Sequence, residues 1–158
     1  STSAQLHEYC EGLDVHEHDF VSIGREGDLV AGGLEQLEKS KLRIDLAELP
    51  TCVQHLNGQR VAIGTAQGRV LLVDLRGGNN EMIKLRGAND GLNCLAVRND
   101  HLLYTGDEMG VIRGWDLRQG AAPLLFTTSH RGGITSLCPH PLSSTLLSAA
   151  DDGSIALH

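Results

Sequence analysis

The chain has 158 residues and a net charge of −7; 41% of its residues are apolar, 3% are aromatic and 19 are glycine. The negative charge argues against a nucleic-acid backbone or an anionic membrane surface as the main partner, because both attract a basic face. No run of about 18 apolar residues predicts a membrane-spanning helix.

Four pairs of short apolar runs follow one another along the chain, and a tight turn separates the two runs of each pair. The first runs span residues 20–23, 61–64, 102–106 and 146–149, and the second runs span residues 29–30, 70–73, 111–112 and 155–157. Each turn contains one glycine, and the spacings are 41, 42 and 43 residues: Gly27, Gly68, Gly110 and Gly153. Each pair is typical of a β-hairpin whose turn glycine adopts a positive φ.

The same period predicts two further strands in each unit. One precedes the hairpin and begins at a set of residues spaced by 42: Cys10, Cys52, Cys94 and Ser136. The other follows the hairpin, at residues 42–46, 82–85 and 124–127; two of these strands come after the similar segments 73–78 and 115–120. Four strands in about 42 residues are typical of one blade of a β-propeller.

The sequence therefore predicts an all-β fold with almost no helix. We expect residues 10–158 to form consecutive antiparallel blades, about three and a half four-stranded blades out of about seven. We expect residues 1–9 to be a loop or the remnant of a preceding blade. Because the chain holds only about 3.8 repeats, we interpret it as a fragment of a longer protein.

Two segments resemble the end of a WD40 repeat, residues 105–116 and 148–157, and residues 130–141 resemble the start of one. In the WD40-repeat β-propeller family, a His, a Ser or Thr, a turn Asp and a Trp form a hydrogen-bonded set within a blade. The resemblance implies a structural set of this kind in the third and fourth units: Thr105 and Trp115, then His130, Ser148 and Asp152. Other residues occupy the remaining slots: Met109, Ala88 and His158 in those two units, and Ile63, Gln67 and Val73 in the second.

For the fourth unit we expect Asp152 to accept a hydrogen bond from His130, with the Ser148 hydroxyl within reach of the imidazole. For the third unit we expect Trp115 to be buried beside Thr105.

Three groups of residues contain the ingredients of a chemical site. His7, Cys10, His16 and His18 could bind a metal, but their spacing does not match structural zinc sites. His130, Ser148 and Asp152 are the residue types of a hydrolase triad, although they coincide with the structural set. The glycine-rich turns 64–68 and 106–110 precede strands, whereas a phosphate-binding loop precedes a helix. We therefore expect no catalytic, cofactor or metal site, and we interpret the four cysteines as reduced, buried thiols of an intracellular protein.

Residues 33–40 depart from the repeat. Leu34 and Leu37 are three residues apart, which fits a helical turn. The segment is either an extended loop between strands or a protruding contact loop.

Residues 20–29, 41–45 and 73–76 resemble the middle of the small WD-repeat nucleoporins of the Y-shaped outer-ring complex, although Gly32 stands where those proteins place an aromatic residue. This resemblance implies a non-enzymatic scaffold that binds proteins, among them other nucleoporins, in the nucleus or nuclear pore, with the cytoplasm as the alternative. A second interpretation is an adaptor that binds a peptide or targeting signal, as ubiquitin-ligase substrate receptors and peroxisomal import receptors do. A third is an enzyme with a site in the central channel, but the predicted inner strands offer few titratable groups.

Overall fold

The computed structural model describes residues 4–36, 42–76, 83–86, 90–120, 122–127 and 130–158. Several positions named above lie outside the described residues: Leu37 and the rest of the segment 37–40, the segment 77–82, and Ala88.

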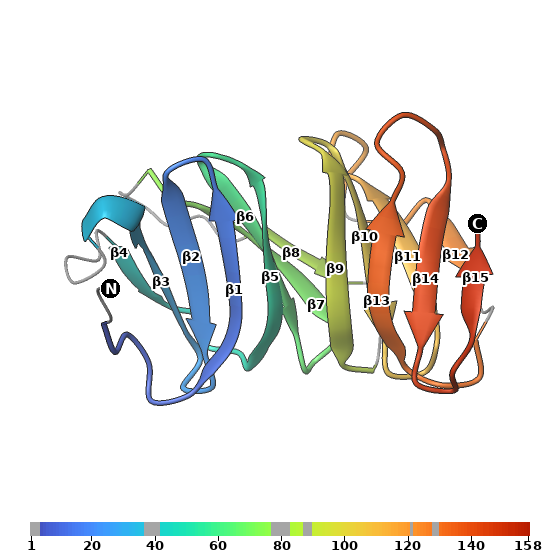
Figure 1. Cartoon of the computed structure of the whole chain (residues 1–158), viewed down its shortest axis with the longest axis horizontal. Helices are drawn as coiled ribbons and strands as arrows, with labels where there is room; N and C mark the ends of the chain where they lie inside the picture. The colour runs from blue at the N-terminus through green and yellow to red at the C-terminus, as the bar shows by residue number, and fades with distance from the viewer. Residues whose placement is uncertain (1–3, 37–41, 77–82, 87–89, 121, 128–129) are drawn as a thin grey trace.

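The described chain folds into four antiparallel sheets in which each strand pairs with the next (Figure 1). We call these sheets blades 1 to 4. Blade 1 contains β1 (Cys10–His16), β2 (Asp19–Gly24), β3 (Asp28–Gly33) and β4 (Leu42–Asp45); blade 2 contains β5 (Pro50–Asn57), β6 (Arg60–Thr65), β7 (Arg69–Asp74) and β8 (Ile83–Arg86). Blade 3 contains β9 (Leu92–Asn99), β10 (Leu102–Asp107), β11 (Ile112–Asp116) and β12 (Leu125–Thr127); blade 4 contains β13 (Ile134–Pro139), β14 (Leu146–Ala150) and β15 (Ile155–Leu157). The predicted all-β propeller architecture is confirmed.

The blades stand side by side, and their first strands β1, β5, β9 and β13 are neighbours along one side of the molecule (Figure 1). The hairpin turns that contain the repeated glycines lie at the lower edge in Figure 1, and the turns after β1, β5 and β9 lie at the upper edge. The C-terminal ends of β3, β7 and β11 share that upper edge, because alternate strands of an antiparallel sheet run in the same direction.

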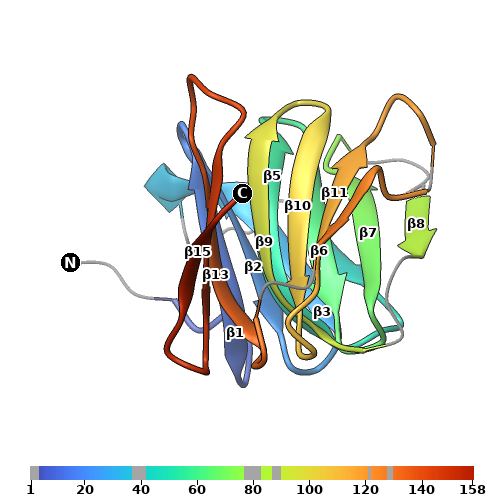
Figure 2. The same cartoon turned by 90° about the vertical axis from the view of Figure 1, so that its right-hand side faces the viewer.

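Apolar cores lie between successive blades. Val21, Ile23 and Leu29 of blade 1 share a buried cluster with Val61, Ile63 and Leu71 of blade 2, and similar clusters join blade 2 to blade 3 and blade 3 to blade 4. Burying these side chains supplies the main stabilisation, at about 25 cal/mol per Å² of apolar surface. Blade 4 stands at one end of the described row of blades (Figure 2). On the face that it turns away from blade 3, the side chains of Leu147, Ile155 and Leu157 are exposed.

The repeated glycines all adopt a positive φ, of 85°, 73°, 79° and 82° for Gly27, Gly68, Gly110 and Gly153. A side chain at such an angle is strained, since its Cβ approaches the following carbonyl oxygen. This explains why glycine recurs at one position of each hairpin.

The expectation of buried thiols is wrong for two of the four free cysteines. Cys10 and Cys138 are exposed, whereas Cys52 and Cys94 are partly buried. Cys138 lies on the open face of blade 4, opposite Leu147, and the Cys10 thiol turns back toward its own strand at Gly12. Burial raises the pKa of Cys52 to about 11 and that of Cys94 to about 12, so both remain thiols at neutral pH.

The irregular segment after β3 begins with a 3-10 helix, η1 (Leu34–Gln36), and not with extended chain. Within the part of the chain that the structure describes, no helix is long and apolar enough to cross a membrane.

Candidate functional site

In blade 4, the polar residues expected from the sequence form a continuous chain of hydrogen bonds. His130 Nδ1 lies 2.6 Å from Ser154 Oγ, and its Nε2 lies 2.6 Å from Ser148 Oγ. Ser154 Oγ donates to Asp152 Oδ1 at 2.5 Å, so it accepts from His130 Nδ1. In a neutral imidazole, Nε2 then accepts from the Ser148 hydroxyl.

The expected hydrogen bond from His130 to Asp152 is therefore a mistake, because Ser154 stands between the two side chains. Asp152 accepts from the backbone N–H of Arg131 at 2.8 Å and from Ser154. These hydrogen bonds, the Ser154 hydroxyl first, hold the pKa of Asp152 well below its usual range. The carboxylate ties the loop before β13 to the turn after β14.

His158 completes the chain from the slot where the family places tryptophan. Its Nε2 lies 2.8 Å from Ser148 Oγ, and Ser148 already donates its proton to His130, so His158 donates. In blade 3, Trp115 Nε1 donates to Thr105 Oγ1 at 3.1 Å in the same way. Histidine and tryptophan therefore supply the same N–H in successive blades. Partial burial, and then the nearby His130, lower the pKa of His158.

This geometry does not suit a hydrolase triad. The Ser148 side chain is buried, with 2% of the residue exposed, and Asp152 does not contact the imidazole. A nucleophilic hydroxyl must meet a substrate carbonyl, and the third group must orient the base. We propose that the set has a structural role within the blade.

We expect Ser154→Ala to destabilise the chain by about 1–3 kcal/mol, because it leaves the Nδ1 of the buried His130 without its partner. Urea denaturation would measure this change. Ser136→Ala, at an exposed serine of β13, is the matched control and should be nearly neutral. Equal stabilities for the two variants would contradict a stabilising role for the hydrogen bonds that link His130 to Asp152 through Ser154.

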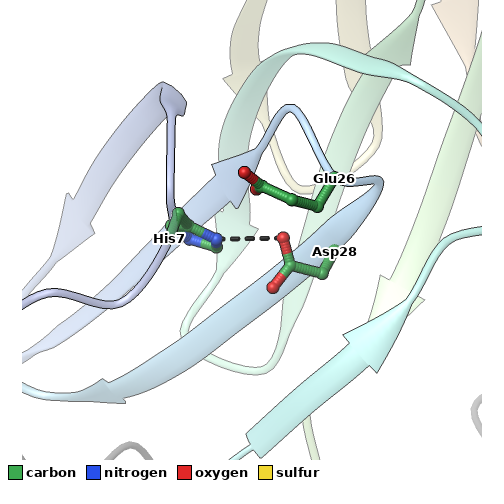
Figure 3. Close-up of side chains that lie close together, drawn as sticks. All are labelled: His7, Glu26 and Asp28. Carbon is green, nitrogen blue, oxygen red and sulfur yellow. Dashed lines mark hydrogen bonds and ion pairs between the residues drawn. The ribbon is translucent and has the colours of Figure 1, made fainter.

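Blade 1 contains an equivalent set that sequence reasoning missed. His7 Nδ1 donates to Asp28 Oδ1 at 2.9 Å (Figure 3). Its Nε2 lies 2.8 Å from Ser22 Oγ. We expected residues 1–9 to be a loop or a remnant of another blade; the described part, residues 4–9, is irregular, but His7 is buried against blade 1. The usable signal was Ser22, which lies 126 residues, or three repeats, before Ser148.

The same region is the one place among the described residues where three potential metal ligands gather. One ligand atom each from His7, Glu26 and Asp28 lies within 4.8 Å of the others (Figure 3). Asp28 is already engaged by His7 and by Arg43 Nη2, which lies 2.5 Å from Oδ2, and Glu26 accepts from the Tyr9 N–H. A metal would compete with the His7 proton and with the Arg43 cation, so hydrogen bonding explains the cluster better.

Of the four residues considered from the sequence as metal ligands, only His7 belongs to this cluster. Among the described residues, Cys10, His16 and His18 join no such group.

The residue directly after the turn glycine contacts the loop that enters the blade in blades 1, 2 and 4. Asp28 contacts His7, and Ser154 contacts His130. In blade 2, Arg69 Nη1 donates to Glu48 Oε1 at 2.7 Å. The partners differ in chemistry, but each pair ties the entering loop to the third strand. Degenerate repeats therefore keep the contact while changing the residues.

Blade 3 uses another acid in place of the missing turn aspartate. Asp107 is fully buried, and its Oδ1 accepts from the backbone N–H groups of Met109 and Val111. Its Oδ2 accepts from Arg113 Nη1 at 2.5 Å. Asp107 lies two residues before the expected slot at Met109, so alignment by repeat position alone could not find it.

The inner strands are also linked across blades by side chains. Asp14 of β1 accepts from the backbone N–H of His55 at 2.6 Å and from its Nδ1 at 3.0 Å. Gln54 of β5 accepts from the backbone N–H of Val97 at 2.7 Å. Burial alone would raise the pKa of Asp14, but the hydrogen bonds from His55 outweigh it and lower the pKa.

We expect Asp14→Asn to reduce stability at neutral pH and to flatten its acid dependence. Because folding lowers the pKa of Asp14, the ionised carboxylate stabilises the fold at pH values above its ordinary pKa of 3.8. This stabilisation is lost as the pH falls below 3.8 and the carboxylate becomes protonated. Thermal denaturation from neutral to acidic pH would show the two curves converging in acid. Asp100→Asn, which changes an exposed turn residue, should run parallel to the unmodified chain.

Comparisons with known proteins agree with this architecture. The family model "WD40: WD domain, G-beta repeat" matches residues 122–158. The crystal structure of the computationally designed Ika4 protein has a TM-score of 0.80 to this chain at 18% identity, covering 99% of this chain and 98% of the designed one. At that identity the likeness concerns the fold alone. The fold is that of a run of β-propeller blades, and residues 122–158 match the WD40 repeat.

Two relatives extend the comparison. The chain is 33% identical over 104 residues to telomerase protein component 1 of Rattus norvegicus, covering 65% of this chain and 4% of that protein. It is 25% identical over 154 residues to nucleoporin Nup43 of Homo sapiens, covering 92% of this chain and 40% of that protein. The chain thus spans less than half the length of either relative.

Proposed function

We propose that this chain is part of a non-enzymatic propeller scaffold that binds proteins in the outer ring of the nuclear pore. The observation that carries the proposal is its similarity to nucleoporin Nup43, which extends over 92% of the chain, whereas the similarity to telomerase protein component 1 covers 65%.

The chemistry of the blades supports a scaffold. The polar residues that could serve a reaction are engaged in tying loops to strands, as His130 and Ser148 are in blade 4 and His7 is in blade 1. Such contacts fix the blades, and rigid scaffolds present loops for binding. The net charge of −7 favours protein partners over nucleic acids and anionic membranes.

Localisation of the full-length protein tests this proposal. A fluorescent tag at the endogenous locus should give a punctate nuclear rim, and affinity purification should recover outer-ring nucleoporins in stoichiometric amounts. The same tag on an unrelated propeller is the control. A diffuse cytoplasmic signal without nucleoporins would contradict the pore assignment.

A second candidate is an adaptor that binds a peptide. One observation favours it: a cavity of about 190 Å³ opens between blades 1 and 2. Its lining includes the apolar side chains of Phe20, Leu42 and Leu75 and, at its polar rim, Gln59 and Arg76. Recovery of a substrate or cargo protein in place of nucleoporins would support this candidate.

A further inference from the structure

We propose that two Asp-Leu-Arg turns, Asp74-Leu75-Arg76 and Asp116-Leu117-Arg118, form a surface that binds an acidic segment of a partner protein. The proposal rests on the protein-binding part of the function above and names the surface and the chemistry of its ligand. We call Arg76 and Arg118 the arginine pair.

The two turns have the same internal geometry. Asp74 Oδ1 accepts from the backbone N–H and the Nε of Arg76, both at 2.9 Å, and its Oδ2 pairs with Arg76 Nη2. Asp116 Oδ1 accepts from the backbone N–H of Arg118 at 3.0 Å and from its Nε at 2.9 Å, and Oδ2 accepts from Nη2 at 2.6 Å. Each aspartate therefore holds its arginine in one orientation.

The leucine between them fixes each turn to the molecule. The backbone N–H of Leu75 donates to the carbonyl of Gln59 at 2.7 Å, and that of Leu117 donates to the carbonyl of His101 at 2.8 Å. Both leucine side chains pack against the cores between blades. The arginines thus stand on anchored backbone, which reduces the entropy lost when a ligand binds.

Each guanidinium uses its Nε and Nη2 within the turn, while the side chains remain 64% and 65% exposed for Arg76 and Arg118. The side-chain hydrogen bond from Arg76 lowers the pKa of Asp74 to about 2, and that from Arg118 holds the pKa of Asp116 well below its usual range, so both turns stay ionised across the physiological range. The outward N–H groups remain directed at solvent, and a carboxylate is the planar acceptor that suits them.

The residues near Arg76 indicate that the ligand carries an apolar side chain next to its carboxylate. Arg76 lines the cavity between blades 1 and 2, together with Phe20, Ala31 and Leu42. A ligand that pairs a carboxylate with Arg76 can place a neighbouring apolar side chain in this cavity. Apolar anchors in pockets are typical binding hot spots.

Blade 1 has a turn at the same position of the repeat, but that turn lacks the aspartate and the arginine. Leu34 donates its N–H to the carbonyl of His18, the same contact that Leu75 and Leu117 make. Its neighbours in the repeat are Gly33 and Glu35, in the slots of the aspartate and the arginine. The exposed Glu35 repels an acidic ligand, so blade 1 lacks the chemistry of the arginine pair.

A nucleic acid is the other anionic partner that arginines attract. A phosphate backbone depends on many cationic contacts, and this surface offers two arginines, each paired with its own aspartate, on a chain of net charge −7. A protein segment with a few carboxylates and an apolar anchor matches the surface better.

Selection from a random linear peptide library displayed on phage, with the full 158-residue chain as bait, tests the proposal. We expect enriched peptides that combine Asp or Glu with an adjacent large apolar residue. For a synthetic peptide of that sequence, we expect the double variant Arg76→Gln, Arg118→Gln to weaken binding about tenfold or more, measured by fluorescence anisotropy. Arg76→Lys with Arg118→Lys should weaken it less, since charge remains but the forked geometry is lost.

The matched control is Arg25→Gln, which removes an equally exposed arginine paired with Glu11 on blade 1 and should leave the affinity unchanged. Circular dichroism of each variant checks that the fold persists. The proposal is overturned by enriched peptides without acidic residues, by affinity that the double glutamine variant does not change, or by oligouridine RNA competing more strongly than the peptide. Pore localisation that survives such a result would leave the scaffold function standing and remove only this surface.

Discussion

Replacing Trp115 with alanine should lower the free energy of unfolding by about 3–5 kcal/mol, the range for large aromatic truncations in a core. The indole is 2% exposed and belongs to the cluster that joins blade 2 to blade 3. Its loss opens a cavity between two blades and leaves the fully buried Thr105 without the Nε1–H donor. Denaturant titration followed by circular dichroism would measure the change.

Trp115→Phe separates packing from hydrogen bonding. It retains most of the apolar volume but removes the donor to Thr105 Oγ1, so we expect a loss of about 1–3 kcal/mol. A denaturation midpoint unchanged in both variants would show that the contact between blades 2 and 3 does not depend on this side chain.

Gly110→Ala should destabilise the chain far more than Gly153→Ala, although the two glycines occupy the same position of the repeat. Their φ angles are nearly equal, 79° and 82°, so each substitution costs about 1–2 kcal/mol for the left-handed conformation. A Cβ on Gly110 would also lie 2.7 Å from the Gly132 carbonyl oxygen and 2.8 Å from that of His130, whereas a Cβ on Gly153 meets nothing within 4 Å. Overpacking against backbone adds about 1–3 kcal/mol at Gly110 alone.

Thermal and urea denaturation of the two variants side by side provide this test, with each glycine variant serving as the control for the other. Equal destabilisation would mean that only the backbone angle matters and that blade 4 moves aside without cost.

The repeat was readable from the sequence because local physics enforces it. A hairpin turn with positive φ requires glycine, and strands that pack between two neighbours require apolar residues, so both recur every 41 to 43 residues. The hydrogen-bond partners within each blade were harder to predict from the sequence. We expected Asp152 to accept a hydrogen bond directly from His130, but Ser154 stands between them, and Asp107 replaces an acid expected two residues later.

The sequence by itself determined the strands, the turn glycines and the all-β propeller architecture, because these depend on contacts between residues close in the chain. Only the tertiary structure decided which residues meet across loops and blades: His7 with Asp28, Asp14 with His55, and the Gly110 turn with the loop that enters blade 4. Such contacts join residues 20 to 41 positions apart, and several residue types can satisfy each one. A buried polar group needs a hydrogen-bond partner at the right distance and angle, but side chains of several types can supply that partner. The repeat pattern therefore does not reveal which residues pair.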